Sequence, residues 1–262
     1  MSKPLLLTDR RPDGSLRITL NRPQIHNAFD ERLIAELTVE LTRAAADPGV
    51  RVVVLTGSGR SFSAGADLNW MHRTASYGEA ENLADARALA KLMATLNELP
   101  KPTIARVNGA ALGGGTGLVA CCDIVVASAE AVFGTTEVRL GLIPSVIGPY
   151  VVAAIGLRQA RRLMLTGERI DAAAAARIGL VHEVVEAGQL DAAVEATLGY
   201  LLRGGPGALA AAKRLVQELA GRPIGPDLID DTAKRIAALR VTPEAREGLA
   251  AFLDKRPPSW PS

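Results

Sequence analysis

The chain has 262 residues, of which 48% are hydrophobic and 22% charged, a composition that excludes a disordered or fibrous protein. Its length suits one large domain or two small ones with a well-formed core. The formal net charge is only +2 and aromatic residues make up 3%, so the sequence offers neither the basic nor the stacking surface that nucleic-acid binding needs. We therefore expect a globular protein that does not bind nucleic acid.

The first half of the chain alternates predicted strands with predicted helices. Apolar runs over 5–7 and 16–20 flank Asp13-Gly14, which favours a hairpin turn. Helical spacing of apolar residues predicts helices over 30–46, with Asp30 as N-cap, and over 83–99, where Pro100 ends the pattern. Short apolar runs predict strands over 51–56, 103–107, 123–127 and 131–133.

The alternation of strand, glycine-bearing loop and helix predicts an α/β fold with parallel strands, whose ligands usually bind at the carboxyl ends of the strands. From residue 157 onward the pattern is mainly helical, with one possible strand over 182–185. The expected helices cover 159–165, 172–176, 190–202, 207–219, 228–239 and 243–253. No linker rich in Pro or Ser separates this part, so we expect a helical layer that belongs to the same protein.

The cysteines and the apolar stretches bear on location. Cys121 and Cys122 are adjacent, and a disulfide between them would need a small strained ring, so we expect two reduced, buried thiols, as in the cytosol. The opening run of three leucines is too short for a signal peptide, and Pro144 and Pro149 interrupt the longest apolar stretch. The sequence predicts a cytoplasmic protein without a membrane span.

Several familiar catalytic motifs are missing. The three histidines are not at metal-ligand spacing, and no Gly-x-Ser-x-Gly motif supplies a serine nucleophile. Residues 115–120 formally match the dinucleotide motif G-x-G-x-x-G/A, but the match lies in mid-chain and the next strand begins too soon after it. The sequence therefore argues against a metal enzyme, a serine hydrolase and a dinucleotide site.

Two glycine-bearing turns carry the strongest signal. Ser63-Ala64-Gly65-Ala66-Asp67-Leu68 follows the strand over 51–56, and Gly113-Gly114-Gly115 follows the strand over 103–107. Backbone N–H groups exposed at two adjacent strand ends could converge on one oxygen, and a helix that starts in the glycine run would add its positive end. The alternative is that both are ordinary tight turns.

These turns belong to a longer series of motifs that resembles the enoyl-CoA hydratase/isomerase (crotonase) family, in order over nearly the whole chain. The series is Asn21-Arg22-Pro23, Asn27-Ala28, residues 63–68, residues 107–115, Cys122-Asp123, Phe133-Gly134 with Glu137, Leu140-Gly141-Leu142-Ile143-Pro144, and finally Phe252, Lys255 and Arg256.

The resemblance implies a fold in which ββα units form a spiral with perpendicular sheets. The core with the acyl-CoA site would cover residues 1–200, and a helical trimerisation region would cover 201–262. It also implies a homotrimer, or a hexamer built as a dimer of trimers. Coenzyme A would enter as part of the substrate, and the resemblance implies no other cofactor and no metal.

The resemblance assigns roles to individual residues. The amides of Ala66 and Gly114 would hold the thioester oxygen, and Glu137 would be the catalytic acid and base. The substrate contacts would come from the loop that holds Arg22, Ile25 and Ala28, from Ala64, Asp67, Leu68, Gly113 and Gly117, and from Phe252 and Lys255 of a neighbouring subunit. From the residues alone, Glu137 could instead charge the start of a helix, and Asp67 reads better as a partner of backbone amides than as an acid or base.

Departures from the family pattern leave the reaction open. Gly117 stands where the usual hydratase has the first of two glutamates, and Ser145-Val146-Ile147 replaces a glycine-rich run. One carboxylate can still move a proton between carbons. We expect a hydratase that acts across the C2–C3 bond of an acyl-CoA, with a branched or methylglutaconyl-type chain as one possible substrate. The alternatives are a Δ3-Δ2 enoyl-CoA isomerase and an acyl-CoA-binding protein without turnover.

Overall fold

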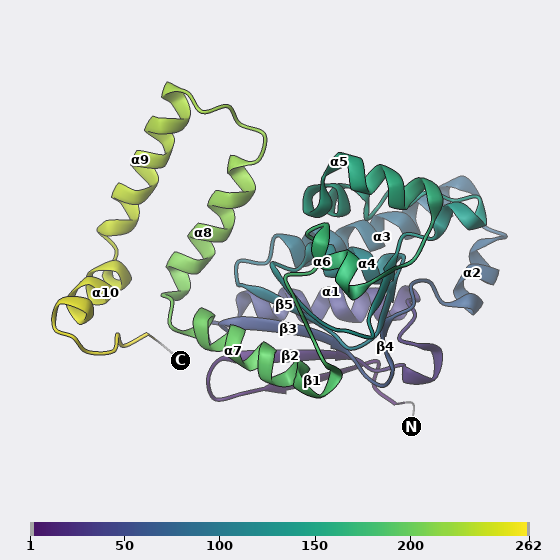
Figure 1. Cartoon of the computed structure of the whole chain (residues 1–262), viewed down its shortest axis with the longest axis horizontal. Coiled ribbons are helices and arrows are strands. Elements are labelled where there is room, and N and C mark those ends of the chain that lie inside the picture. The colour runs from purple at the N-terminus through teal and green to yellow at the C-terminus, as the bar shows by residue number, and fades with distance from the viewer. Residues whose placement is uncertain (1–2, 261–262) are drawn as a thin grey trace.

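The structure is a computed structural model, which describes residues 3–260. A six-stranded sheet runs through its centre in the order β1-β2-β3-β5-β7-β10 (Figure 1). Its strands are β1 (Leu6–Arg10), β2 (Ser15–Leu20), β3 (Val52–Gly57), β5 (Thr103–Val107), β7 (Ile124–Ser128) and β10 (Glu183–Val185). Only β1 and β2 pair antiparallel, so the hairpin and the parallel core predicted from the sequence are confirmed.

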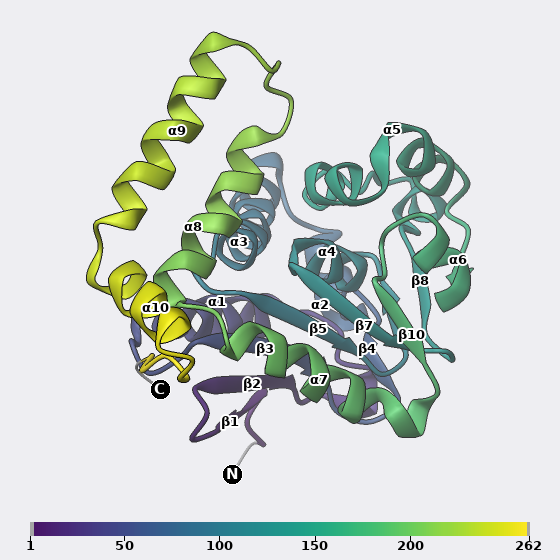
Figure 2. The same ribbon diagram turned by 60° about the vertical axis from the view of Figure 1, so that its left-hand side comes forward.

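Helices cover both faces of this sheet. On one face α1 (Glu31–Ala46), α3 (Glu79–Asn97) and α4 (Gly114–Cys121) bury the main core cluster, and on the other α7 (Leu190–Leu202) packs on a smaller cluster (Figures 1 and 2). Val52 and Val54 point toward α7, whereas Val53 and Leu55 belong to the main core. All six residues of β3 are buried, as expected for a strand that is covered on both sides.

A second sheet of very short strands stands beside the first, and of its strands only β8 was predicted from the sequence, as the strand over 131–133. Its order is β4-β6-β8-β9, with β4 (Ser61–Ser63), β6 (Ala110–Leu112), β8 (Val132–Gly134) and β9 (Ile170–Asp171). Each of β4, β6 and β8 follows directly on a strand of the large sheet along the chain. Runs of two or three residues show no period-2 pattern, so this sheet exists because of its tertiary neighbours.

Further helices complete the core. They are the short helices η1 (Pro23–Ile25), η2 (Glu137–Leu140) and η3 (Ala187–Gln189), and the α-helices α2 (Leu68–Thr74), α5 (Gly148–Thr166) and α6 (Ala172–Arg177). Helix α5 begins eleven residues earlier than predicted at 159, because Pro149 is tolerated in its first turn and its two halves are joined at Gly156, which has φ 73°.

Three helices extend away from this core. α8 (Pro206–Leu219), α9 (Pro226–Arg240) and α10 (Pro243–Leu253) form a projecting arm, and α8 lies nearest to α3 (Figure 2). Lys213 of α8 ties the arm to the core through Asp123, at 2.8 Å, and the Arg51 side chain donates to the Gly204 carbonyl at its base. No helix within residues 3–260 is both long and apolar enough to cross a membrane.

The α/β core and the C-terminal helices agree with the predicted fold class. Both cysteines are free and buried, which agrees with the expectation of two reduced thiols in the core.

Candidate active site

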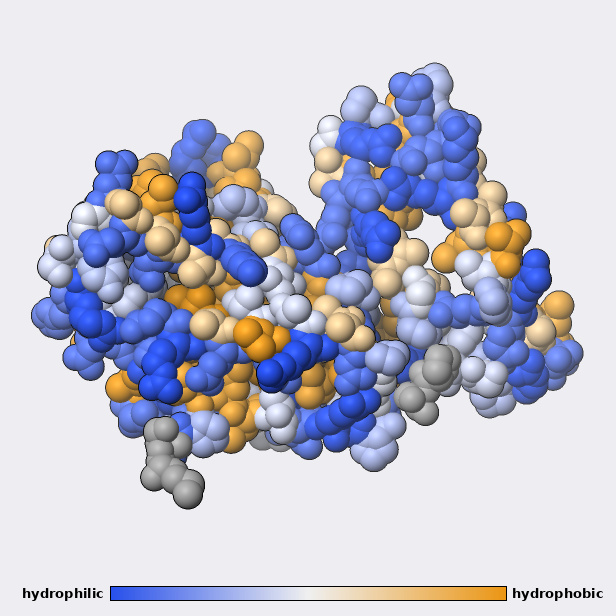
Figure 3. Space-filling view, turned by 180° about the vertical axis from the view of Figure 1, so that it is seen from behind, coloured by the Kyte–Doolittle hydropathy of each residue, from blue (hydrophilic) through white to orange (hydrophobic). Residues whose placement is uncertain are grey.

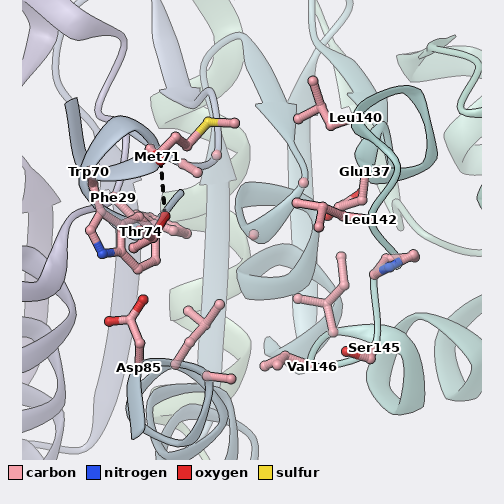
Figure 4. A pocket seen from close by; sticks show the side chains of 18 of the residues that line it. Phe29, Trp70, Met71, Thr74, Asp85, Glu137, Leu140, Leu142, Ser145 and Val146 are labelled. Atoms are coloured by element: carbon pink, nitrogen blue, oxygen red, sulfur yellow. Dashed lines mark hydrogen bonds between the residues drawn. The ribbon is translucent and has the colours of Figure 1, made fainter. Parts of the chain in front are cut away.

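A cavity of about 470 Å³ opens where the ends of the two sheets meet α2, α3 and the segment from η2 to the start of α5 (Figure 4). Trp70, Met71 and Asp85 line one side, and Glu137, Leu142 and Val146 line the other. Most of the lining side chains are apolar, which is typical of a pocket that orients a ligand with a few polar groups. Both glycine-bearing turns reach this cavity.

The backbone N–H of Ala66 points away from the strand beside it. Phe29 N–H donates to the Gly65 carbonyl at 2.6 Å, and Asp67 N–H donates to the Phe29 carbonyl at 2.7 Å, so residues 29 and 66 form a parallel bridge. In a parallel bridge of this kind, the residue between the two hydrogen-bonded ones, here Ala66, directs its own N–H away from the partner strand. Ala66 is exposed and lines the cavity, so its N–H is available to a ligand.

The N–H of Gly114 is available for a different reason. Gly114 is the first residue of α4, so its N–H has no acceptor within the helix, and the positive end of the helix dipole lies at the same point. A Cβ on residue 114 would lie 2.6 Å from Phe29 Cε2, and a Cβ on Gly65 would lie 2.9 Å from the Leu112 carbonyl oxygen. Glycine is therefore required where the two turns approach each other.

Glu137 is the buried carboxyl beside these turns. It begins η2, and its Oε2 is fully buried without a hydrogen-bond partner among the described residues. Burial raises the pKa of Glu137 above its ordinary value. A carboxyl with a raised pKa and an unused oxygen in a cavity is suited to giving and taking protons.

The loop that carries Ala66 is held by an ion-pair network. Arg22 contacts both Asp67 and Asp30 at 3.0 Å and donates to the Ala28 carbonyl at 2.7 Å. Asp67 also accepts from the N–H groups of Asn69 and Trp70, and so caps α2. The interpretation of Asp67 as a partner of backbone amides is confirmed, and Arg22 is engaged inside the protein.

The predicted site residues fall into two groups. Those that line the cavity are Ala64, Ala66, Leu68, Gly113, Gly114 and Glu137. Those that do not line it are Arg22, Ile25, Ala28, Asp67, Gly117, Phe252 and Lys255. Gly117 lies behind Ile147, which lines the cavity in its place, and the last two belong to the end of the projecting arm.

Sequence reasoning missed Asp85, whose carboxyl also lines the cavity. The sequence signal that could have identified Asp85 was weak. Asp85 stands one helical turn before Leu89 in the predicted helix over 83–99, so both residues lie on the same face, but an acidic residue on a half-exposed helix is usually a solvated charge.

A cavity at the strand ends of an α/β core that holds a carboxyl of raised pKa beside a helix start is a candidate site for acid–base catalysis. Residues 10–262 match the family described as enoyl-CoA hydratase/isomerase. The chain belongs to that family, and it is an enzyme of the lyase class.

Relatives of known name support this assignment. A putative enoyl-CoA hydratase of Thermus thermophilus is 37% identical over 93% of this chain and 96% of that protein. The 2,3-dehydroadipyl-CoA hydratase of Escherichia coli is 38% identical over 95% and 96%.

Solved structures share the whole fold. An enoyl-CoA hydratase from Shewanella pealeana matches with a TM-score of 0.95 at 43% identity, over 98% of this chain and 96% of that one. A putative enoyl-CoA hydratase/isomerase from Legionella pneumophila matches with a TM-score of 0.92 at 45% identity, over 99% and 100%. The predicted crotonase-type fold is therefore confirmed.

Proposed function

We propose that the chain adds water across the C2–C3 double bond of an acyl-CoA thioester, or removes it, in the cavity beside Glu137. The observation that carries this proposal is the meeting of three groups at one cavity: the N–H of Ala66, the N–H of Gly114 and a buried carboxyl with an unused oxygen. Two N–H donors can stabilise the oxygen of an enolate, and the carboxyl can exchange a proton with C2.

In this proposal the thioester oxygen lies between the two N–H groups. As the oxygen of water bonds to C3, the π electrons move toward the thioester, and the two donors stabilise the negative charge that develops there. One donor of this kind is worth about 2.7–4 kcal/mol. Glu137 gives its proton to C2 in hydration and takes it back in dehydration, and the attacking water loses one proton to a base as its oxygen bonds to C3. The raised pKa of Glu137 supports its role, because a larger fraction of the carboxyl is protonated near neutral pH.

The acyl chain would lie against an apolar wall. Leu142, Pro144, Val146 and Ile147 line the side of the cavity next to Glu137, and Trp70 and Met71 line the other. Apolar side chains on both sides suit a short or branched chain, which supports a branched substrate as the finer proposal. A methylglutaconyl-type chain would bring a carboxylate into the cavity, and no cation is found among the described residues that line it.

A Δ3-Δ2 isomerase is the second candidate, and one observation favours it. Ile147 keeps position 117 out of the cavity, so Glu137 is the one carboxyl next to the two N–H donors among the lining residues. A single carboxyl can carry a proton from C2 to C4 and back.

Three probes distinguish the candidates: crotonyl-CoA, 3-methylglutaconyl-CoA and a 3-enoyl-CoA. Loss of the conjugated-enoyl absorbance from either of the first two supports hydration, and its appearance from the third supports isomerisation. Binding of all three with no turnover supports the acyl-CoA-binding protein and contradicts the proposal.

We further propose that the projecting arm is covered in a homotrimer or hexamer. Large apolar side chains of α8–α10 are exposed in the single chain, Phe252 at 80% and Leu253 at 76% among them. Figure 3 shows apolar residues on the arm as well as on the core. Such a surface is expected to be buried against another subunit, where Phe252 and Lys255 could reach a neighbour's substrate. We place the protein in the cytoplasm.

A further inference from the structure

Hydration needs a group that holds the water and takes its proton, and position 117 is closed to such a group. A Cβ on residue 117 would lie 2.2 Å from Ile147 Cγ2 and 2.8 Å from Ile147 Cβ. Ile147 is itself buried and immediately precedes α5, so it has little room to move aside. A carboxyl side chain at residue 117 would require Ile147 to move.

The cavity nevertheless has a second carboxyl. Among the described residues that line it, the acidic ones are Glu137 and Asp85. Asp85 comes from α3, and Figure 4 shows it on the side of the cavity opposite Glu137, below Trp70. A ligand that fills the space between these walls would therefore lie between two carboxyls.

The polar neighbours of Asp85 on this wall are already engaged. The Thr74 hydroxyl donates to the Met71 carbonyl at 3.1 Å, and the Asn82 amide donates to the carbonyls of Tyr77 and Gly78. Asp85 makes no ion pair with any residue between 3 and 260. Asp85 accepts a hydrogen bond from the Trp70 side chain, and the remaining lone pairs of its two oxygens can accept a hydrogen bond from water.

The charges around Asp85 favour its role as a base. Burial raises the pKa of Asp85, and the negative charge of Glu31 in α1 raises it further. The hydrogen bond from the Trp70 side chain and the positive charge of Arg73 in α2 lower the pKa in part. Arg73 is itself paired with Glu31 at 2.8 Å. A carboxylate whose pKa is raised takes a proton from water more readily than an ordinary aspartate does.

We propose that Asp85 is the second catalytic carboxyl of this site: it holds the attacking water and takes its proton. The inference rests on the proposed hydratase function. The water oxygen bonds to C3, the π pair moves through the thioester enolate to C2, C2 takes the proton of Glu137, and the proton that leaves the water goes to Asp85. A proton then passes from Asp85 to Glu137 through solvent before the next turnover.

The test separates water addition from proton transfer at C2. Asp85→Asn and Glu137→Gln are compared with the full-length protein and with Glu79→Gln, a matched control in which an exposed carboxylate of the same helix is changed outside the cavity. Hydration is followed with crotonyl-CoA and 3-methylglutaconyl-CoA. Proton transfer alone is followed as deuterium uptake at C2 of butyryl-CoA, which has no double bond to hydrate.

We expect Asp85→Asn to lower kcat for hydration at least about 100-fold, within the range for loss of an acid–base group, while KM changes less than about threefold. The fall in kcat that protonation of Asp85 causes at low pH should disappear from the pH profile. Deuterium uptake should stay within about twofold of the unchanged protein. Glu137→Gln should abolish both reactions, and Glu79→Gln should change neither.

Hydration by Asp85→Asn at the unchanged rate and pH profile would overturn the role of Asp85. An equal loss of hydration and deuterium uptake would also overturn it, because it would show general damage to the site. Absence of hydration with both enoyl probes in the unchanged protein, while deuterium uptake proceeds, contradicts a water-activating role. Retention of both reactions in Glu137→Gln would instead contradict the proposed function itself.

Discussion

Gly113 lies against the carboxyl of Glu137: a Cβ on residue 113 would lie 3.2 Å from Glu137 Oε1. Gly113 N–H also donates to the Gly134 carbonyl at 2.8 Å, three residues before Glu137. The turn that begins α4 and the segment that carries the acid are thus fixed to each other. The donor at Gly114 and the proton at Glu137 cannot move independently, which is the arrangement that enolate chemistry requires.

Glu137→Gln should remove turnover and leave acyl-CoA affinity near that of the unchanged protein. Glutamine keeps the size of the side chain and cannot give a proton to C2, so kcat should fall by a factor of about 10²–10⁴ or more. Steady-state kinetics together with calorimetric titration of a saturated acyl-CoA separates the two effects. Full activity of the variant would exclude Glu137 as the acid.

The same variant should be more stable than the unchanged protein at neutral pH. Because burial raises the pKa of Glu137 in the folded state, ionisation of this carboxyl costs folding free energy as pH rises above the unfolded pKa, near 4.5. The glutamine variant has no such cost. Its gain in Tm should therefore be present at pH 7 and vanish near pH 4. An equal gain at both pH values would contradict burial of an ionisable group.

Residue 117 and Ile147 should be coupled. Gly117→Ala places a Cβ against Ile147 and should lower the free energy of unfolding by about 1–3 kcal/mol, the usual cost of overpacking. Ile147→Ala should be less harmful in the Gly117→Ala background than alone. Denaturant unfolding of the four proteins gives the coupling energy, and additive changes would show that the two residues do not touch.

This coupling revises an expectation that follows from the family pattern. Gly117→Glu alone should not raise hydration of crotonyl-CoA, since the longer side chain meets Ile147 before it reaches the cavity. Any gain should require a smaller residue at position 147 as well. Initial rates for the single and the double variant decide this point.

The ion pairs of Arg22 should be important for both stability and rate. Arg22→Met leaves Asp67 and Asp30 without their half-buried cation, and we expect a loss of about 1–3 kcal/mol of unfolding free energy, less than for a fully buried pair. Because Asp67 follows Ala66 directly, kcat should fall too. Thermal unfolding and kinetics of Arg22→Met test this expectation, and Arg162→Met, which breaks an exposed pair with Glu168 away from the cavity, is the control.

Much of the fold could be predicted because its signals are local. α1 begins after Asp30 as its N-cap pattern predicts, and β5 covers 103–107 as its apolar run predicts. β4 and β6 could not be predicted, since three residues carry no periodicity and their pairing depends on strands more than forty residues apart. α2 was missed for a related reason: only Trp70 is buried in its seven residues.

The candidate site could be predicted only in part. The glycine runs stand out in the sequence for a chemical reason, whereas the role of Glu137 was predicted from its place in the family motif. Asp85 does not stand out, because its importance depends on which wall of the cavity α3 forms. The contact between Gly117 and Ile147 joins residues thirty positions apart, and no sequence pattern predicts it.

The position of the thioester oxygen tests the central claim most directly. A crystal structure of Glu137→Gln with bound crotonyl-CoA should place that oxygen about 3 Å from the backbone nitrogens of both Ala66 and Gly114, with C2 facing residue 137. A well-ordered substrate whose thioester oxygen contacts neither nitrogen, or only one of them, would contradict the account.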